Sequence, residues 1–411
     1  MRLGVYADMA YRRDGRTVSA AQPFVRFVCA LPPRVDEVVL FGRLDPAPGR
    51  AAYAVPGESV RFVALPHYPR VTDVAAMAAA LPRTRAIFAA ELTRLDAVLV
   101  FGPHPMAVAL AHAARRAGTP LVLGVRQDYP AYIRDRLPGP GWRWAGPAAG
   151  ALDRAFRALA RDTPVVALGA PLAARYAGGG APVLDLACSL VPEREIVSPA
   201  AALARDWDGG GPLELLAVGR LAPEKDPLAL LAVLDLLRAR GGAWRLTVVG
   251  DGPLRGALER EAAARGLRRA VRLLGDVPNG PELWARYRAA DAFLHLARTE
   301  GLPQVLVEAH AAGLPVVATC VGGVPDALGH GARGLLVEPG DPAAAAAALE
   351  RLDADPALRR RLVLAGLDHA RDQSLERQLD RLATFAHAAA SATRSQRYRS
   401  NASVRKSPAT R

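Results

Sequence analysis

Short apolar runs alternate with longer amphipathic segments along most of the chain. In the first half, the unbroken apolar run 97–101 predicts a buried strand, and the segment 106–117, closed by Gly118, predicts a helix. The polar segment 11–19 interrupts this rhythm and predicts a loop. On the same criteria we expect strands at 3–7, 38–42, 60–64, 120–125, 164–167 and 183–186, and helices at 21–31, 71–95 and 148–161.

The second half has a sharper pattern, in which local signals mark most helix starts and stops. Asp226 followed by Pro227 marks a helix start, and Gly241 marks the end of that helix. Strands are expected at 213–218, 245–249, 271–274, 292–296, 315–319 and 334–337, and helices at 226–240, 254–265, 281–289, 303–312 and from 341. Strands that alternate with helices predict an α/β protein with parallel sheets covered on both faces.

The length of 411 residues allows two domains with full cores. The weakest interior pattern lies at 191–211, which contains two prolines and a glycine run, so we place an interdomain linker there. The expected organisation is a Rossmann-like domain at 1–190, the linker, a second Rossmann-like domain at 212–370, a last helix at 371–390 and a disordered basic tail at 391–411.

Composition and charge narrow the class of protein. No apolar run reaches the roughly 18–20 residues of a spanning helix, and the chain turns polar too soon after Met1 for a signal peptide, so we expect a cytoplasmic protein. Cys29, Cys188 and Cys320 are too widely spaced to indicate a disulfide framework. The formal net charge of +13 suits an anionic ligand or membrane surface. Because the chain lacks a basic ladder studded with aromatic residues, no nucleic-acid partner is expected.

Residues 134–146 depart from the alternating pattern. They are rich in proline and glycine and place Trp142 and Trp144 beside several arginines, ahead of the amphipathic helix expected at 148–161. One interpretation is a surface loop followed by a helix that packs on the core. The other is peripheral contact with the anionic inner face of a membrane, because tryptophan and arginine together favour membrane interfaces.

The stretch 297–319 combines several features of a binding site. Pro303 suits the first position of a helix, and Gly313 suits the residue just past its end. The amides left free at the helix start would be those of Gln304, Val305 and Leu306. Such a terminus is a ready anion site, and here Glu300 precedes it and Glu308 follows it. Carboxylates beside an anion site suit a ligand that carries both hydroxyls and phosphate, such as a sugar nucleotide.

Three further loops follow expected parallel strands, at the edge where α/β proteins bind ligands. Arg220 and Lys225 place two cations close together, which suits a diphosphate, although an isolated pair would more commonly be solvated surface charge. Residues 250–253 (Gly-Asp-Gly-Pro) are not a dinucleotide fingerprint, because Arg255 replaces the third glycine, but they permit a close backbone approach. The backbone at Val277 could contact a base.

Two aspartate pairs raise the question of a metal site. Asp206 and Asp208, and likewise Asp353 and Asp355, have the spacing with which one class of sugar transferases chelates a nucleotide-bound cation. Both pairs stand where turns and helix caps are expected, since Asp355 precedes a proline at a helix start. We therefore expect no metal site.

In their order along the chain, these motifs resemble the retaining glycosyltransferases of family 4. The matching segments are GRLAPEKD (219–226), VVGDGPLRGALE (248–259), LLGDV (273–277), TEGLPQVLVEAHAAGLPVVAT (299–319), GGVPD (322–326) and GLLV (334–337). Glu300 and Glu308 stand in register with that family's Glu-x7-Glu signature. The resemblance covers most of 212–350 and rests on several ordered motifs.

The resemblance implies the GT-B fold, with two Rossmann-like domains facing a central cleft and the last helix crossing back to the first domain. The acceptor would bind mostly to the N-terminal domain and the donor to the C-terminal one. Arg220 and Lys225 would hold the diphosphate, Glu308 the ribose hydroxyls, Glu300 a hydroxyl of the transferred sugar, and Val277 the base. Backbone groups of the loop and helix start would complete the donor site, at Gly301, Leu302, Gln304, Val305 and Leu306.

The implied chemistry is retention at the anomeric carbon, usually without a metal. Arg220, Lys225 and the helix start would stabilise the charge that develops on the leaving diphosphate. Because that phosphate can itself accept the acceptor's proton, Glu300 is better interpreted as a group that orients the sugar. The rival interpretation makes Glu300 and Glu308 the acid/base pair of a hydrolase.

The first half departs from the family pattern. The loop after the first strand has a single glycine, Gly15, where family members often have a pair. Family members often carry a catalytic His or Asp after a middle strand, and the candidates are Asp128, which we favour, and His104. Residues 126–130 resemble the Arg-Asp-aromatic-Pro version of that loop with Gln127 inserted.

The resulting hypothesis is a retaining hexosyltransferase of polysaccharide biosynthesis. It would use a nucleotide-diphosphate sugar, a glycan, lipid-linked or small-molecule acceptor, and no cofactor, with Glu300, Arg220, Lys225 and Asp128 as catalytic residues. One alternative is a sugar-nucleotide epimerase or hydrolase on the same fold, which would form product from donor alone. Another is a non-catalytic nucleotide-sugar-binding protein, which would bind donor without turnover.

Overall fold

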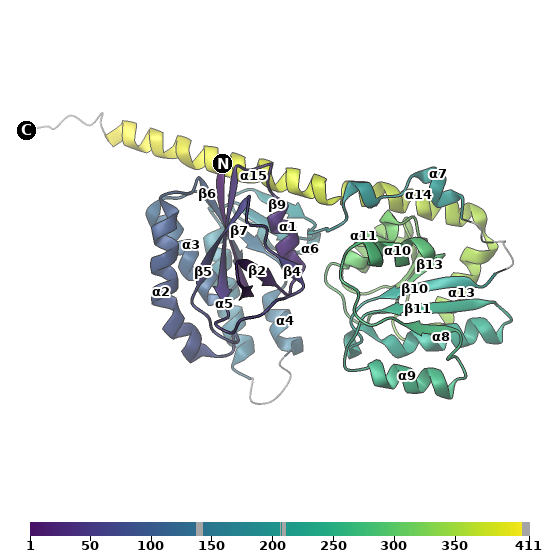
Figure 1. Ribbon diagram of the computed structural model, residues 1–411. Coiled ribbons are helices and arrows are strands. Elements are labelled where there is room, and N and C mark those ends of the chain that lie inside the picture. Colours follow the sequence, from purple (N-terminus) through teal and green to yellow (C-terminus); the bar gives the residue numbers. More distant parts are fainter. Residues whose placement is uncertain (137–142, 206, 208–210, 405–411) are drawn as a thin grey trace, which may run out of the picture. The chain divides into compact units, whose positions relative to one another are not determined.

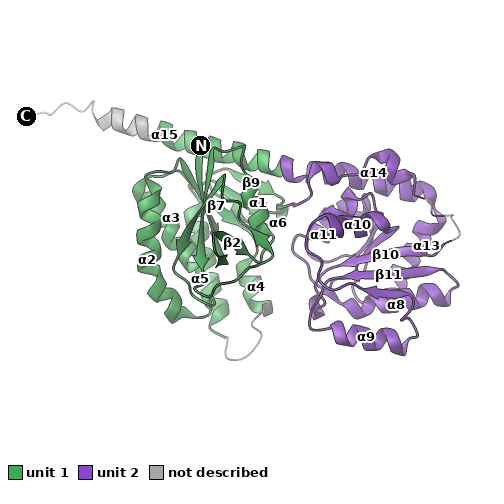
Figure 2. Ribbon diagram, in the orientation of Figure 1, with its two compact units in different colours: residues 1–188, 378–411 green, residues 189–377 purple. Residues whose placement is uncertain are grey.

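The computed structural model describes residues 1–136, 143–205, 207 and 211–404 (Figure 1). The chain forms two compact units. Unit 1 comprises residues 1–188 and 378–411, and unit 2 comprises residues 189–377 (Figure 2). Each unit is an α/β body built on its own, mainly parallel, sheet, as the alternating pattern predicts.

Unit 1 has the strand order β4-β2-β1-β6-β7-β8-β9, and β3 pairs with both β1 and β5. The strands are β1 (Arg2–Asp14), β2 (Thr17–Ala20), β3 (Glu37–Leu44), β4 (Tyr53–Ala54), β5 (Val60–Leu65), β6 (Ala97–Gly102), β7 (Leu121–Val125), β8 (Val165–Leu168) and β9 (Val183–Leu186). The helices are α1 (Phe24–Cys29), α2 (Val74–Leu92), α3 (Pro105–Ala117), α4 (Tyr129–Arg136), α5 (Ala145–Ala160) and α6 (Ala170–Tyr176).

The prediction of a loop at 11–19 is wrong. Strand β1 continues to Asp14, turns at Gly15 with a φ of +56°, and pairs antiparallel with β2. Tyr11 is fully buried in this extension and packs on Phe62 at a ring-centroid distance of 4.8 Å. The polar residues after Tyr11 misled the pattern, because an exposed hairpin can keep its outer positions polar while its partner strand satisfies the backbone.

Unit 2 has the all-parallel strand order β12-β11-β10-β13-β14-β15. Its strands are β10 (Leu213–Val218), β11 (Trp244–Val249), β12 (Val271–Leu273), β13 (Ala292–His295), β14 (Val316–Thr319) and β15 (Leu335–Val337). Its helical segments are η2 (Glu193–Glu195), α7 (Pro199–Leu203), η3 (Pro223–Lys225), α8 (Pro227–Ala239), α9 (Arg255–Ala264), α10 (Pro281–Ala289), α11 (Gln304–Ala311), α12 (Val324–Ala327), η4 (Gly329–Gly331), α13 (Pro342–Ala354) and α14 (Pro356–Asp372).

Both faces of the unit 2 sheet are buried. Successive side chains of β10 pack into hydrophobic clusters on opposite faces of the sheet. Leu215 packs in the cluster that contains residues of α8, and Leu216 packs in the cluster that contains residues of α11. In a strand, neighbouring side chains point to opposite faces, so a sheet covered on both sides needs continuous apolar runs. This explains why LELLAV and AFLH, which lack alternation, are strands.

The expected linker at 191–211 is instead part of unit 2. The Val197 amide donates to the Ala311 carbonyl at 2.9 Å, and the Arg205 guanidinium donates to the Ala312 carbonyl at 2.7 Å. These bonds bind the segment to the end of α11. Residues 206 and 208–210 of the expected linker lie outside the described residues. In the described part, the two prolines mark irregular backbone that is bonded to unit 2 rather than a free connection.

The last helix also differs from expectation. Helix α15 (Leu375–Val404) starts in unit 2 and belongs to unit 1 from Gln378 onward, where the Gln378 side chain accepts a hydrogen bond from the Ala187 amide at 2.9 Å. The helix continues past Ser391, where the disordered tail was expected to begin. Buried alanines up to Ala390 anchor the preceding turns. Residues 405–411 lie outside the described part of the chain.

Candidate functional site

The candidate site of unit 2 lies where the strand order reverses. Strand β10 is flanked by β11 on one side and β13 on the other, so the loops that leave the carboxyl ends of β10 and β13 diverge at this point. In open parallel sheets such a switch point is the usual place for a ligand. The loop after β10 carries Arg220 and Lys225, and the loop after β13 carries Glu300.

The loop after β10 rests on the Gly-Asp-Gly-Pro turn. The Leu221 amide donates to the Asp251 carbonyl at 3.0 Å. A Cβ on Gly250 would lie 2.0 Å from the Gly219 carbonyl oxygen, and one on Gly252 would lie 2.4 Å from that of Leu221. The glycines therefore allow close approach, as expected, but to the backbone that presents Arg220 rather than to an open space.

A second glycine pair, Gly322 and Gly323, packs directly against the backbone of the Glu300 loop. A Cβ on Gly322 would lie 1.7 Å from the Glu300 carbonyl oxygen, and one on Gly323 would lie 2.1 Å from that of Gly301. The Gly323 amide also donates to the Gly301 carbonyl at 3.1 Å. These contacts hold Glu300 and Gly301 in place without any side chain between the two loops.

Lys225, Glu300 and His295 form one ionic cluster. The Lys225 ammonium pairs with the Glu300 carboxylate, and His295 Nε2 lies 3.0 Å from the same Glu300 oxygen. The Glu300 side chain is only 12% exposed. Burial alone would raise the pKa of Glu300, but the His295 hydrogen bond and the Lys225 charge outweigh burial and lower it to about 2. Glu300 is therefore a fixed anion at neutral pH.

His295 was not among the predicted residues. It ends β13, a strand that is otherwise apolar, and the signal that the sequence offered was a histidine at the end of an apolar run. Lys225 and Glu300 were assigned separate roles, and their direct pairing could not be predicted because they are 75 positions apart in the chain. Arg220 is exposed and has no ion-pair partner within the described residues.

Asp226 marks the helix start but does not cap it with its side chain. It adopts a left-handed conformation with φ +44°, and its carboxylate accepts a hydrogen bond from Arg298 Nε at 2.8 Å. The Arg298 amide in turn donates to the Glu224 carbonyl at 2.8 Å. The two loops of the site are thus joined directly beside Lys225.

Glu308 is buried in α11 and faces two donors. The Tyr287 hydroxyl donates to one carboxylate oxygen at 2.6 Å, and the Asn279 amide donates to the other at 3.1 Å. Burial raises the pKa of Glu308 to about 7, because these two hydrogen bonds only partly offset the loss of water. Asn279 lies two residues after Val277, so Glu308 also ties α11 to the loop expected to meet a base. Neither Asn279 nor Tyr287 was predicted.

The start of α11 differs slightly from expectation. Pro303 is the capping residue and the helix begins at Gln304. The Leu306 amide already donates to the Pro303 carbonyl at 3.1 Å, so this group is not free. Within the described residues, the amides of Gln304 and Val305 have no partner and remain available to an anion. Gly313 follows the helix with φ +68°, as predicted.

The two candidates in unit 1 occupy different environments. Asp128 accepts a hydrogen bond from the Ala131 amide at 3.2 Å at the start of α4, and its carboxylate pairs with Arg175. His104 is buried, accepts a hydrogen bond from the Met106 amide at 3.2 Å, and lies 3.2 Å from Asp8. Burial lowers the pKa of His104 despite the nearby Asp8 carboxylate.

His104 belongs to a buried polar cluster that the sequence did not reveal. Asp8 accepts a hydrogen bond from the Tyr68 hydroxyl at 2.6 Å and lies 2.8 Å from Arg43 Nε. The Arg43 guanidinium stands 4.1 Å from the centroid of the Tyr68 ring. Asp8 lies within β1, Arg43 lies near the end of β3 and His104 follows β6. Because β1 pairs with both β3 and β6, only the sheet brings these three residues together.

The aspartates considered as metal ligands divide into two groups. Asp355 accepts a hydrogen bond from the Leu358 amide at 2.9 Å and caps α14, as expected. Asp206 and Asp208 lie outside the described residues, as does Trp142. In the described ranges, no three His, Cys, Asp or Glu side chains gather as a candidate metal site. No helix within those ranges is long and apolar enough to cross a membrane.

Solved structures identify the fold of the chain. Sucrose-phosphate synthase from Thermosynechococcus elongatus superposes with a TM-score of 0.65 at 18% identity, covering 98% of this chain and 99% of that one. HepE from Anabaena, solved in complex with UDP, gives a TM-score of 0.66 at 19% identity over 93% and 98%. This likeness over nearly complete chains shows that the protein has the GT-B fold, as expected from the sequence.

Sequence comparisons place the likeness mostly in unit 2. Residues 208–368 match the family described as "Glycosyl transferases group 1". A D-inositol 3-phosphate glycosyltransferase from Thermomonospora curvata is 38% identical over 125 residues, 30% of this chain and 29% of that protein. The lipopolysaccharide core biosynthesis glycosyltransferase LpsD from Rhizobium meliloti is 37% identical over 134 residues, 33% and 38% of the two chains. The chain thus covers only 29% and 38% of the length of these two relatives. The family match at 208–368 lies within unit 2.

Proposed function

We propose that this protein is a retaining glycosyltransferase of the family 4 type. It transfers a hexose from a nucleoside diphosphate to a glycan, lipid-linked or small-molecule acceptor. The main support is the cluster of Lys225 and Glu300 beside Arg220 at the switch point of unit 2. This segment is also the one that matches the group 1 glycosyl transferases.

The donor diphosphate would lie between Arg220, Lys225 and the start of α11. Arg220 is exposed and unpaired within the described residues, and the amides of Gln304 and Val305 have no partner there. These groups supply charge and hydrogen-bond donors for phosphate oxygens. Gly301 and Leu302, in the same loop, would contribute backbone contacts, whereas the Leu306 amide would not, because it bonds to the Pro303 carbonyl.

Glu300 and Glu308 would bind hydroxyl groups at the two ends of the diphosphate. Glu300 is held as an anion and would accept a hydrogen bond from the transferred sugar. Glu308 would bind the ribose, with Asn279 and Tyr287 orienting its carboxylate. The backbone at Val277 would face the base. No resident metal or cofactor is part of this proposal.

In the proposed reaction, the bond between the anomeric carbon and the diphosphate oxygen breaks as the acceptor oxygen bonds to the same face. The acceptor's proton passes to the leaving phosphate oxygen. Arg220, Lys225 and the helix amides stabilise the negative charge that develops there, which is where electrostatic stabilisation accelerates the reaction most. Asp128 is the proposed unit 1 contributor near the reacting sugar, with His104 as the alternative.

The proposed donor is a UDP-hexose. Structures with the same fold were solved in complex with UDP and with UDP-glucose. The test is a thermal-shift screen of UDP-, GDP-, ADP- and dTDP-sugars, followed by acceptor trials with the sugars that bind. Stabilisation by the UDP-sugars and acceptor-dependent release of UDP are expected, and stabilisation by another nucleotide series alone would contradict the proposed donor. Release or isomerisation of the sugar without acceptor would favour a hydrolase or epimerase, and binding without turnover would favour a non-catalytic protein.

We further propose a cytoplasmic protein with peripheral contact to an anionic membrane through the start of α5. Trp144, which precedes α5, is 51% exposed. Tryptophan and arginine at a surface favour the interfacial region of a bilayer. Co-sedimentation with anionic vesicles should fall when Trp144 is replaced by alanine. Absence of binding by the unaltered protein would end this proposal.

A further inference from the structure

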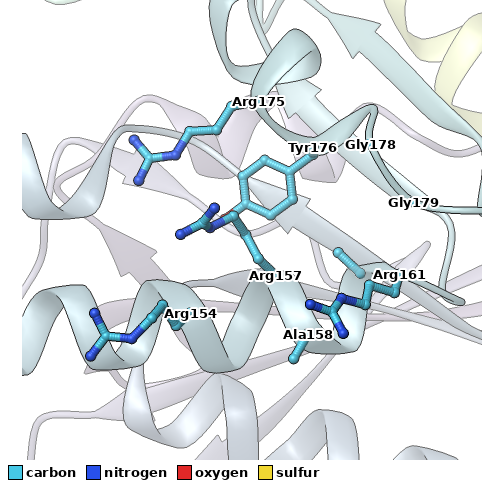
Figure 3. Close-up of a pocket in the computed structure, with 9 residues that line it drawn as sticks. Arg154, Arg157, Ala158, Arg161, Arg175, Tyr176, Gly178 and Gly179 are labelled. Atoms are coloured by element: carbon cyan, nitrogen blue, oxygen red, sulfur yellow. The ribbon is translucent and has the colours of Figure 1, made fainter.

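A pocket on unit 1 is lined by arginines and lies outside the proposed donor site. It has a volume of about 420 Å³, within the range of pockets that hold small molecules. Its charged lining comes from Arg154 and Arg157 of α5, from Arg161 directly after α5, and from Arg175 of α6 (Figure 3). The other lining residues are Ala158, Ala160, Tyr176, Gly178 and Gly179. None of these described residues is acidic.

Two arginines of α5 and the helical capping residue Arg161 share one face of the helix. Arg154, Arg157 and Arg161 are three and four positions apart, which is the spacing of neighbours on a helix surface. Figure 3 shows them following one another along α5, with Arg175 and Tyr176 on the segment opposite. Gly179 closes that segment against α5, because a Cβ there would lie 2.9 Å from the Arg161 Cα.

A buried carboxylate holds two of these arginines in place. Asp153 is only 3% exposed. One of its oxygens accepts hydrogen bonds from Arg157 Nε at 3.0 Å and from Arg175 at 2.7 Å, and the Tyr176 hydroxyl lies 3.4 Å from the other. Arginines anchored in this way lose little conformational freedom when a ligand binds.

The cluster carries an excess of positive charge. Arg157 and Arg175 share Asp153, and Arg175 also pairs with Asp128. Arg154 and Arg161 have no ion-pair partner within the described residues. Four guanidinium groups against two carboxylates therefore leave a formal charge of +2 around the pocket.

We propose that this pocket binds a phosphate-bearing anion. The charge matches a phosphate dianion, and the planar guanidinium group binds phosphate oxygens in pairs. On a solvated basic surface, arginine side chains can move apart to reduce repulsion. Here all four arginines line the same pocket, and Asp153 holds Arg157 and Arg175 in place through hydrogen bonds. The site is independent of the donor site in unit 2 and does not rest on the proposed function.

The test is calorimetric titration of the full-length protein with inorganic pyrophosphate at low salt, where screening is weak. The titration is made in an Arg220→Ala/Lys225→Ala background, which removes the cations of the proposed donor site. Pyrophosphate binding should persist in that background and weaken about tenfold or more when Arg154→Ala/Arg161→Ala is added. Both residues are exposed, so the protein should fold normally, as circular dichroism can check.

The matched control is Arg83→Ala/Arg85→Ala. These exposed arginines on α2 lie away from the pocket lining, and their loss changes the net charge by the same amount. The control should bind pyrophosphate within about twofold of its parent. Equal weakening in both double variants, or no binding once Arg220 and Lys225 are removed, would overturn the proposal.

A second arm distinguishes the source of the phosphate. The same variants are sedimented with phosphatidylcholine vesicles that contain or lack phosphatidic acid. Retention that requires both phosphatidic acid and the Arg154–Arg161 pair identifies a lipid headgroup. Pyrophosphate binding that requires the pair, without such retention, identifies a soluble phosphorylated compound. Independence from the pair in both arms refutes the site.

Discussion

Replacing Lys225 with methionine tests the ionic cluster that supports the proposed donor site. The change keeps most of the aliphatic stem but removes the cation, and it leaves Glu300 with His295 as its remaining partner. Glu300 would then be a carboxylate that is largely shielded from water and has lost one of the two side chains that stabilise its charge. Two properties should change together: the stability of unit 2 and its affinity for a free nucleoside diphosphate.

The pKa of Glu300 sets the size of the effect. Its fall from 4.5 to about 2 reflects Lys225 and His295 together. At 1.36 kcal/mol per pKa unit this corresponds to about 3 kcal/mol, which is an upper limit for the two partners together. Since the Lys225 side chain is 27% exposed, we expect Lys225→Met to cost about 1–2 kcal/mol. Because the folded pKa lies below the unfolded one, this stability is full above about pH 4.5 and is lost as pH falls toward 2.

The assay is a double-mutant cycle with Glu300→Gln, followed by urea unfolding at pH 7.5 and pH 3 and by calorimetric titration with the diphosphate. The double variant should be about 1 kcal/mol more stable than the sum of the single changes predicts. Lys225→Met should weaken diphosphate binding about tenfold or more. Glu300→Gln should change it about threefold or less, because the proposed partner of Glu300 is the transferred sugar, which a free diphosphate lacks. The control is Arg240→Met, which breaks an exposed pair with Glu350 and should cost under about 0.5 kcal/mol.

The reasoning fails if Lys225→Met leaves diphosphate affinity unchanged. The assigned division of roles also fails if Glu300→Gln weakens the free diphosphate as much as Lys225→Met does. If the effects of the two changes on the free energy of unfolding were additive, the pairing of Lys225 with Glu300 would contribute nothing to stability.

Three further predictions follow from the same site. Glu308 has a folded pKa of about 7 against 4.5 when unfolded, so its contribution to stability should decrease as pH rises from about 4.5 to 7, and Glu308→Gln should reduce that decline in urea unfolding. Gly322→Ala forces a Cβ to within 1.7 Å of the Glu300 carbonyl oxygen and should abolish donor-induced thermal stabilisation. Gly331→Ala is its control, because it has a positive φ of 99° but no atom within 4 Å of the new Cβ, so donor binding should survive. Asp128→Asn should lower acceptor-dependent turnover about 100-fold or more with donor affinity kept, if Asp128 acts at the reacting sugar; unchanged turnover would exclude it.

Local signals predicted the elements of the fold where they act within one segment. Gly118 and Gly313 end their helices with φ of +63° and +68°, and Asp355 caps α14, because these preferences depend only on neighbouring backbone. The segments at 11–19 and 191–211 were misjudged for the opposite reason. Pairing with β2 in one case, and with the end of α11 in the other, supplies partners that polarity and proline content do not reveal.

The candidate site shows the same division. Arg220, Lys225 and Glu300 could be selected from the sequence, since each follows a strand and parallel strands end at a common edge. His295, Asn279 and the charge state of Glu308 could not. The pKa of Glu308 depends on burial, which is a property of the packed unit, and a partner such as Tyr287 is recruited from a separate helix.

By itself, then, the order of apolar runs, caps and glycines determined two α/β units, the limits of several of their helices and the chemistry available at the strand ends. These depend on interactions that span a few residues. Only the tertiary structure decided that Lys225 pairs with Glu300, that glycine backbones support the Glu300 loop, and that arginines converge on Asp153 in unit 1. Such contacts join residues far apart in the chain, and their energies depend on burial that exists only once the sheets have packed.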